Sequence, residues 1–214
     1  SRMDTDCHYV VPANIAPHLD FISPTKRFPS VKHIKDNPYH RHQSPLQDVT
    51  PPFIQQLYQI NNVKGKSLSN KQGVASFMGQ YFDNNDVESF WNAYNITNNI
   101  NLITRMSNNG TQPSGFGTEA SMNVEYITSI GQSIPTEIWY TADNNNDNNN
   151  TVTAEPFLLF LLDILNSTNP PWLFTVSYSD YEMNLGYSYC NRCNTEFVKL
   201  GTMGITMLIA SGDY

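Results

Sequence analysis

Two segments decide the fold: Leu-Phe-Thr-Val-Ser-Tyr at residues 173–178 and Ile-Thr-Met-Leu-Ile-Ala at residues 205–210. The second has the length and composition of a buried parallel strand, and the first is also predicted to be a strand. Residues 185–203 between them are predicted to form a helix that closes at Gly204. Strand, helix and strand in this order predict a parallel sheet with a right-handed crossover.

The rest of the chain continues the alternation of strands and helices. A further strand is predicted at 134–141, and helices are predicted at 51–58, 73–81, 86–94, 119–131 and 155–165. Thr50 is expected to cap the first of these helices, because two prolines follow it in the first turn. The Asn/Asp-rich residues 143–150 have the composition of a surface loop. The pattern predicts an α/β fold in which helices flank a parallel sheet.

Acidic and amide side chains stand at two places where such folds carry active sites. Asp213 follows the last predicted strand, and the carboxyl ends of strands form the ligand-binding edge of open α/β sheets. Glu119, Asn123 and Tyr126 are spaced so that they share one face of a helix, for which Thr118 is a plausible cap. The two places together predict an acidic site.

Charge and histidine content restrict the chemistry. Residues 46–214 hold six Lys/Arg against fifteen Asp/Glu, a net charge of −9, and contain no histidine. The negative charge of residues 46–214 argues against binding to nucleic acids or anionic membranes. Without histidine it cannot supply the imidazole base of a Ser-His-Asp site or build a His-rich zinc site. A general base in this body must therefore be a carboxylate, which works best in acid unless burial raises its pKa.

Cysteines and glycosylation sequons add weaker signals. Cys190 and Cys193 have neither a second Cys-x-x-Cys nor a later histidine, which argues against zinc and leaves a local disulfide or two buried thiols. Four Asn-x-Ser/Thr sequons are candidate glycosylation sites, at Asn95, Asn109, Asn149 and Asn166. The longest apolar run, residues 157–162, is too short to span a bilayer.

Two motifs resemble the sedolisin family of serine-carboxyl peptidases, and within it the lysosomal tripeptidyl peptidase branch. They are Gly-Thr-Glu-Ala-Ser-Met-Asn-Val-Glu-Tyr at 117–126 and Ala-Ser-Gly-Asp at 210–213. The resemblance continues in family order over nearly all of residues 9–214. Its other segments are Tyr-Val-Val-Pro (9–12), His-Leu-Asp-Phe (18–21), Arg-Phe-Pro (27–29), Val-Thr-Pro (49–51) with Leu-Tyr (57–58), Gln-Tyr-Phe (80–82), Glu-Pro-Phe-Leu (155–158), Thr-Val-Ser-Tyr (175–178) and Asn-Thr-Glu (194–196).

The resemblance implies a domain organisation. Residues 1–29 correspond to the end of a propeptide, and residues 30–45 to a linker with an activation site next to Pro45-Leu46. Residues 46–214 correspond to the N-terminal part of the peptidase domain. The implied fold is an incomplete subtilisin-like parallel sheet flanked by helices.

The resemblance also implies roles for individual residues. Glu119 matches the general base, and Asn123 stands where the family has an aspartate that orients this base. Asp213 matches the acid that donates to the oxyanion. Ser177, Tyr178 and Ser179 match a strand that lines the substrate cleft, although Ser179 replaces the usual glycine. Asp180 matches an acid near the amino end of the substrate.

Two hypotheses from different classes follow. The first is an acid tripeptidyl peptidase of the lysosome or the secretory pathway, made as a zymogen, that acts on peptides or proteins with free N-termini. The family's nucleophilic serine and calcium ligands lie downstream of the matched residues. We therefore expect no activity, metal or cofactor in these 214 residues alone, and calcium only in the complete family domain. The second hypothesis is a truncated pseudopeptidase that binds a C-terminal partner chain or a second copy, because its sheet has an open edge.

Overall fold

The computed structural model describes residues 11–19, 48–60, 63–67, 69–97, 102–107, 116–142 and 156–211. Several predictions from the sequence lie outside these residues. They concern Asp213, Asn109, Asn149, the linker with its activation site, most of the propeptide segment, and the Asn/Asp-rich insert.

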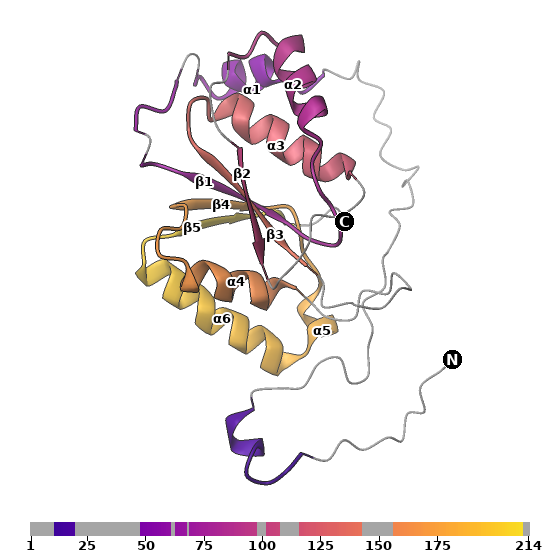
Figure 1. The fold of residues 1–214 in the computed structure, drawn as a ribbon, viewed down its shortest axis with the longest axis vertical. Coiled ribbons are helices and arrows are strands. Elements are labelled where there is room, and N and C mark those ends of the chain that lie inside the picture. The colour runs from indigo at the N-terminus through magenta and orange to yellow at the C-terminus, as the bar shows by residue number, and fades with distance from the viewer. Residues whose placement is uncertain are drawn as a thin grey trace, which may run out of the picture.

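The core of the fold is a parallel sheet of five strands in the order β2-β3-β1-β4-β5 (Figure 1). The strands are β1 (Gln72–Ser76), β2 (Leu102–Ser107), β3 (Thr136–Thr141), β4 (Leu173–Val176) and β5 (Thr206–Ile209). Every pairing between neighbouring strands is parallel, with Val74 opposite Ile138 on one side and Thr175 on the other. The predicted α/β class with a parallel sheet is therefore confirmed.

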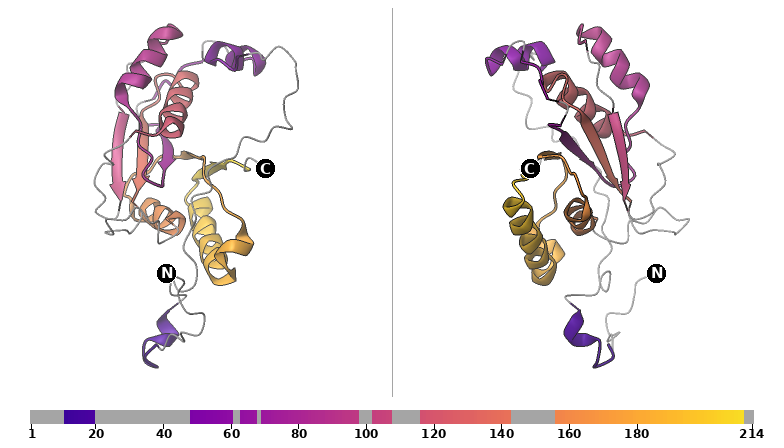
Figure 2. Two further views of the ribbon diagram at one scale, coloured as in Figure 1. Left: turned by 90° about the vertical axis from the view of Figure 1, so that its right-hand side faces the viewer. Right: turned by 60° about the vertical axis from the view of Figure 1, so that its left-hand side comes forward.

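Helices cover the two faces of this sheet, as Figures 1 and 2 show from three directions. The helices α1 (Pro51–Leu57), α2 (Asn84–Ala93) and α3 (Thr118–Ile130) pack together on one face. The helices α4 (Phe157–Asn166), α5 (Glu182–Leu185) and α6 (Tyr187–Thr202) cover the other. A short 3-10 turn, η1 (Ala16–His18), precedes them in the chain. None of the described helices is long and apolar enough to cross a membrane.

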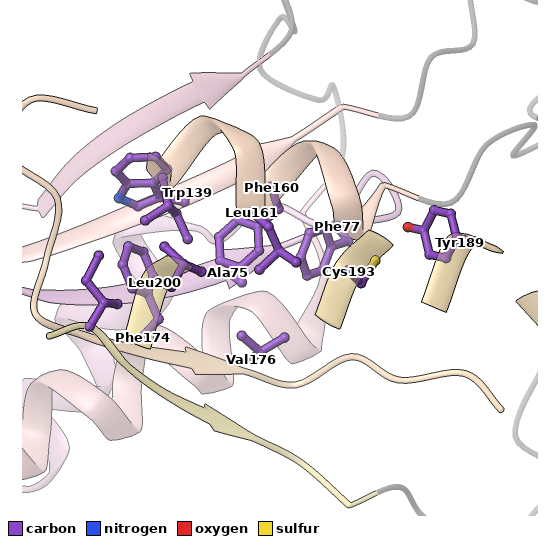
Figure 3. Close-up of a cluster of buried hydrophobic side chains, with 12 residues drawn as sticks. Ala75, Phe77, Trp139, Phe160, Leu161, Phe174, Val176, Tyr189, Cys193 and Leu200 are labelled. Atoms are coloured by element: carbon purple, nitrogen blue, oxygen red, sulfur yellow. The ribbon is translucent and has the colours of Figure 1, made fainter. Parts of the chain in front are cut away.

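Each face has its own apolar core. On the face of α4 and α6, the side chains of Phe77, Trp139 and Phe174 meet Phe160 from α4 and Leu200 from α6 (Figure 3). On the other face, Ile138 packs against residues of α2 and α3, including Val87 and Val124. The alternation of side chains along β3 explains this division, because Ile138 and Trp139 point to opposite faces.

Some predicted elements form as expected and others do not. Thr50 caps α1 by accepting a hydrogen bond from the backbone N–H of Phe53 at 3.3 Å. Residues 73–81, predicted to be helical, instead form β1 and a turn in which Met78 and Gly79 have positive φ. A run of five buried residues fits the centre of a parallel sheet as well as it fits a helix, so periodicity cannot separate the two. Strand β2 is an additional element that the sequence analysis does not predict.

Candidate active site

The candidate site lies where β1, β4 and the N-terminus of α3 meet. From β1 the chain crosses to β2 on one side of the sheet, whereas β4 and β5 follow on the other side. Strand ends on the two sides of such a switch diverge and leave a crevice at their carboxyl ends. A small cavity of about 70 Å³ occupies this place. It has room for about two water molecules.

Four of the predicted site residues line this cavity together. Glu119 and Asn123 reach it from α3, and Ser177 and Tyr178 reach it from the end of β4. The spacing of four residues between Glu119 and Asn123 places them one turn apart on one helix face, as predicted. Tyr126, the third residue of that face, donates a hydrogen bond to the carbonyl of Val49 at 2.6 Å and thus anchors the segment before α1.

Helix α3 begins at a glycine that lies close to the turn after β1. Gly117 is the N-cap, in an extended conformation, so Thr118 is the first helical residue and not the predicted cap. A Cβ atom at Gly117 would overlap the side-chain oxygen of Gln80, and the Gly117 N–H donates to the carbonyl of Tyr81 at 2.8 Å. The hydrogen bond from Gly117 to Tyr81 holds the start of α3 against the segment that follows β1. Glu119 lies in that first turn, where the helix dipole favours a negative charge.

A direct hydrogen bond joins α3 to β4 inside the site. The Ser177 hydroxyl donates to the side-chain oxygen of Asn123 at 3.0 Å, and both residues are half-buried. Sequence reasoning placed both residues in the site, but it did not predict that they bond to each other.

The other predicted substrate residues lie apart from Glu119. Ser179 and Asp180 are exposed and line a second cavity of about 190 Å³ on the α6 side. Asp180 accepts a hydrogen bond from the backbone N–H of Tyr181 at 2.7 Å. Tyr178 lines both cavities, and its ring packs against Phe77 with the ring centroids 4.9 Å apart. The predicted cleft residues 177–180 therefore do not line one cavity. Ser177 lines the small cavity, Ser179 and Asp180 line the second, and Tyr178 lines both.

Gln80 is a polar residue of the small cavity to which the sequence assigns no role. Gln80 lines it from the turn after β1, and its side-chain oxygen is buried without a hydrogen-bond donor among the described residues. The signal in the sequence was the Gln-Tyr-Phe segment of the resemblance, which carried no chemical role. The structure adds a buried acceptor beside Gly117 and the site.

The cysteine pair is a pair of free thiols. Cys193 is buried in the core on the side of α4 and α6 (Figure 3). Cys190 is half-buried and lines the second cavity. Burial, and to a lesser extent the charge of Glu182, raises the pKa of the Cys190 thiol, so this thiol is a poor nucleophile near neutral pH. Of the two alternatives, the structure has free thiols and no disulfide between them, but only Cys193 is buried as expected.

Two of the predicted glycosylation residues are described. Asn95 follows α2 with a positive φ, Asn166 ends α4, and both are exposed. Their modification stays a prediction. Within the described ranges, no three His, Cys, Asp or Glu side chains are grouped so that they could hold a metal ion.

Comparisons with known proteins identify the relatives of this chain. It is 33% identical to tripeptidyl-peptidase 1 of Canis lupus familiaris, 34% identical to that of Mus musculus and 31% identical to that of Homo sapiens. Each match covers 96% of this chain, and the chain spans 36% of the length of these curated relatives. No model of a known protein family matches the chain.

A solved structure carries the same fold. Pseudomonas sedolisin, a serine-carboxyl proteinase in complex with pseudo-iodotyrostatin, superposes with a TM-score of 0.57 and 14% sequence identity. The match covers 77% of this chain and 44% of the sedolisin chain. At 14% identity this likeness shows a common fold. The evidence for the family comes from the sequence identity to tripeptidyl-peptidase 1. Together they establish that this chain belongs to the sedolisin family of serine-carboxyl peptidases, in the part of it that includes tripeptidyl-peptidase 1.

Proposed function

We propose that the protein to which these residues belong is an acid peptidase that releases tripeptides from free N-termini. The observation that carries this proposal is the identity of 31–34% with tripeptidyl-peptidase 1 over 96% of the chain. It is supported by the meeting of Glu119, Asn123 and Ser177 in one cavity at the carboxyl end of the sheet. A carboxylate base also suits a body without histidine.

The proposed roles follow the chemistry of the side chains. Glu119 is the general base that takes the proton of a serine nucleophile, and Asn123 orients Glu119. Asp213, in its protonated form, donates a hydrogen bond to the oxyanion. Tyr178, Ser179 and Asp180 contact the peptide. The nucleophile and the calcium ligands are proposed to come from residues beyond this segment, so that these 214 residues alone do not hydrolyse peptides.

We further propose how such an enzyme is made. Residues 1–29 end a propeptide that is cut within the linker at 30–45, next to Pro45-Leu46. The sequons at Asn95, Asn109, Asn149 and Asn166 are glycosylated on the way to the lysosome or the cell exterior. Mass spectrometry of the secreted product tests both ideas through the mature N-terminus and the attached glycans.

A pseudopeptidase is the second candidate, and the amide at Asn123 favours it. A carboxylate in this place could share a proton with Glu119, whereas an amide cannot. By analogy with an orienting aspartate in another protease class, replacement by asparagine costs about 10⁴-fold in rate. Such a protein would act by binding a C-terminal partner chain or a second copy.

The deciding experiment uses the complete gene product, expressed in a secretory host and activated in acid. We expect hydrolysis of a tripeptide-coumarin substrate and acid-dependent labelling by a serine-directed probe. The Glu119→Gln variant should lose about 10²–10⁴-fold in kcat, which is the range that general acid–base catalysis contributes. A mature product that shows neither hydrolysis nor labelling would leave the pseudopeptidase as the function.

A further inference from the structure

The Ser177 hydroxyl is directed at Asn123 and not at open space. Its Oγ donates to Oδ1 of Asn123 at 3.0 Å, between the end of β4 and the first turns of α3. Both side chains are half-buried and line the same small cavity as Glu119. The contact therefore ties the candidate base-orienting residue to a different element of the fold.

An asparagine depends on such a hydrogen bond for its side-chain orientation more than an aspartate does. An aspartate offers two equivalent oxygens, so either rotamer accepts a hydrogen bond. An asparagine has an oxygen that only accepts and an NH2 group that only donates, and a half-turn of the amide exchanges them. Beside a carboxylate, the donating orientation attracts and the accepting orientation repels. Without the Ser177 hydroxyl, only the charge of Glu119 would select the donating orientation of the Asn123 amide.

We propose that Ser177 is a positioning residue that holds the Asn123 amide with its NH2 group towards Glu119. Because the Ser177 hydroxyl engages Oδ1, the NH2 group is the part of the amide that remains to reach Glu119, one turn earlier on the same helix. The inference rests on the proposed function, in which Glu119 is the base. It assigns Ser177 a task inside the catalytic machinery, in place of direct contact between its hydroxyl and the substrate.

The first test reads the amide itself and needs no activity. In the ¹⁵N-labelled chain, the Asn123 side-chain NH2 should behave as a rigid group, with an order parameter of about 0.85. In Ser177→Ala it should fall below about 0.6, and Ser177→Thr, which keeps a hydroxyl, should restore it. Unchanged order in Ser177→Ala overturns the proposal.

A matched control separates positioning from a general loss of stability. Ser121, also on α3, accepts a hydrogen bond through its hydroxyl from the backbone N–H of Asp83 at 3.1 Å and is buried. Ser121→Ala should lower the melting temperature and leave the Asn123 amide signal as it is. An equal loss of Asn123 order in Ser121→Ala would show that the effect belongs to the whole helix, and would also overturn the proposal.

The second test uses the complete, activated protein. Ser177→Ala should lower kcat by about 10-fold at unchanged KM, because small misplacements of catalytic groups cost up to 10²-fold. In the Asn123→Asp background, where two equivalent oxygens need no orientation, the same change should cost less than about 2-fold. Equal losses in both backgrounds contradict the proposal. An inactive wild type would refute the proposed function alone, since the amide test still decides the role of Ser177.

Discussion

At the scale of single residues, Asn123 is the position that separates this chain from the pattern of its family. Its amide accepts from Ser177 and lies one turn from Glu119, so the site keeps a hydrogen-bonding group but lacks a second charge. In the complete protein we expect Asn123→Asp to raise kcat by about 10²–10⁴-fold, because a carboxylate can share a proton with the base. Steady-state hydrolysis of a tripeptide-coumarin substrate across acid pH measures this. Asn123→Ala is the control and should lower the rate.

A second residue, Glu137, holds a buried charge cluster in the sheet. Its carboxylate, 1% exposed, accepts from Lys71 at 2.7 Å, from Arg105 at 3.2 Å and from the Trp139 indole N–H at 3.1 Å. Burial by itself would raise the pKa of Glu137, but the hydrogen bonds from Arg105 and Lys71 and their charges outweigh it. The pKa therefore lies below the usual 4.5.

Glu137→Gln should lower the free energy of unfolding by about 2–4 kcal/mol at neutral pH, since it leaves the largely buried Lys71 ammonium without its counter-charge. A depressed carboxyl pKa contributes stability above pH 4.5, and this is lost as the pH falls through the folded-state value. The difference between the variant and the wild type should therefore shrink below about pH 4. Urea unfolding at pH 7 and in acid measures it, with the exposed Glu88→Gln as control. A gap that stays constant with pH would refute this account.

At the scale of elements, the central strand β1 depends on a glycine. A Cβ atom built on Gly73 would lie 2.4 Å from ring carbons of Phe174 on β4, and that ring is itself fully buried. Gly73→Ala should therefore destabilise the fold by about 1–3 kcal/mol through overpacking. The opposite sign is expected for Gly201→Ala on α6, where a Cβ would meet nothing within 4 Å. There alanine should add up to about 1 kcal/mol, because it favours the helix. Thermal unfolding of both variants checks the contrast.

Some elements of the fold could be predicted from the sequence, whereas the central strand β1 could not. Strand β4, helix α6 and strand β5 follow from two apolar runs with a helical stretch between them, because length and spacing separate these elements clearly. The sequence could not reveal that residues 72–76 form the middle strand. Their burial depends on Phe174, which lies about a hundred residues later in the chain. The alternately exposed edge strand β2 gave too weak a pattern to predict.

Part of the site could likewise be predicted. The helical spacing placed Glu119 and Asn123 together, because that relation is local. The hydrogen bond between Asn123 and Ser177 joins residues 54 positions apart, and only the way α3 packs on the sheet determines it. Non-local contacts of this kind decide the chemistry, and periodicity carries no information about them.

At the scale of the whole molecule, one edge of the sheet is exposed. Among the described residues β5 pairs only with β4, and its Leu208 and Ile209 are 56% and 42% exposed. The prediction that residues 205–210 form a buried strand is therefore wrong about burial, since only Ile205 of this segment is buried. Parallel strands are ordinarily covered on both faces. Leu208 also lines an apolar groove of about 650 Å³ with Met122 of α3 and Leu173 of β4. An uncovered edge beside an apolar groove is a surface at which chains associate.

We therefore expect the 214-residue polypeptide, expressed by itself, to self-associate at micromolar concentration. Leu208→Lys should shift it towards the monomer, because a charge at an edge strand opposes pairing and cannot be buried in the groove without cost. Val198→Lys is the matched control, since Val198 is 67% exposed on α6 and does not line the groove. Sedimentation velocity over a concentration series measures the association. A wild-type chain that stays monomeric throughout, or an equal effect of both lysine variants, would show that β5 is not the surface that associates.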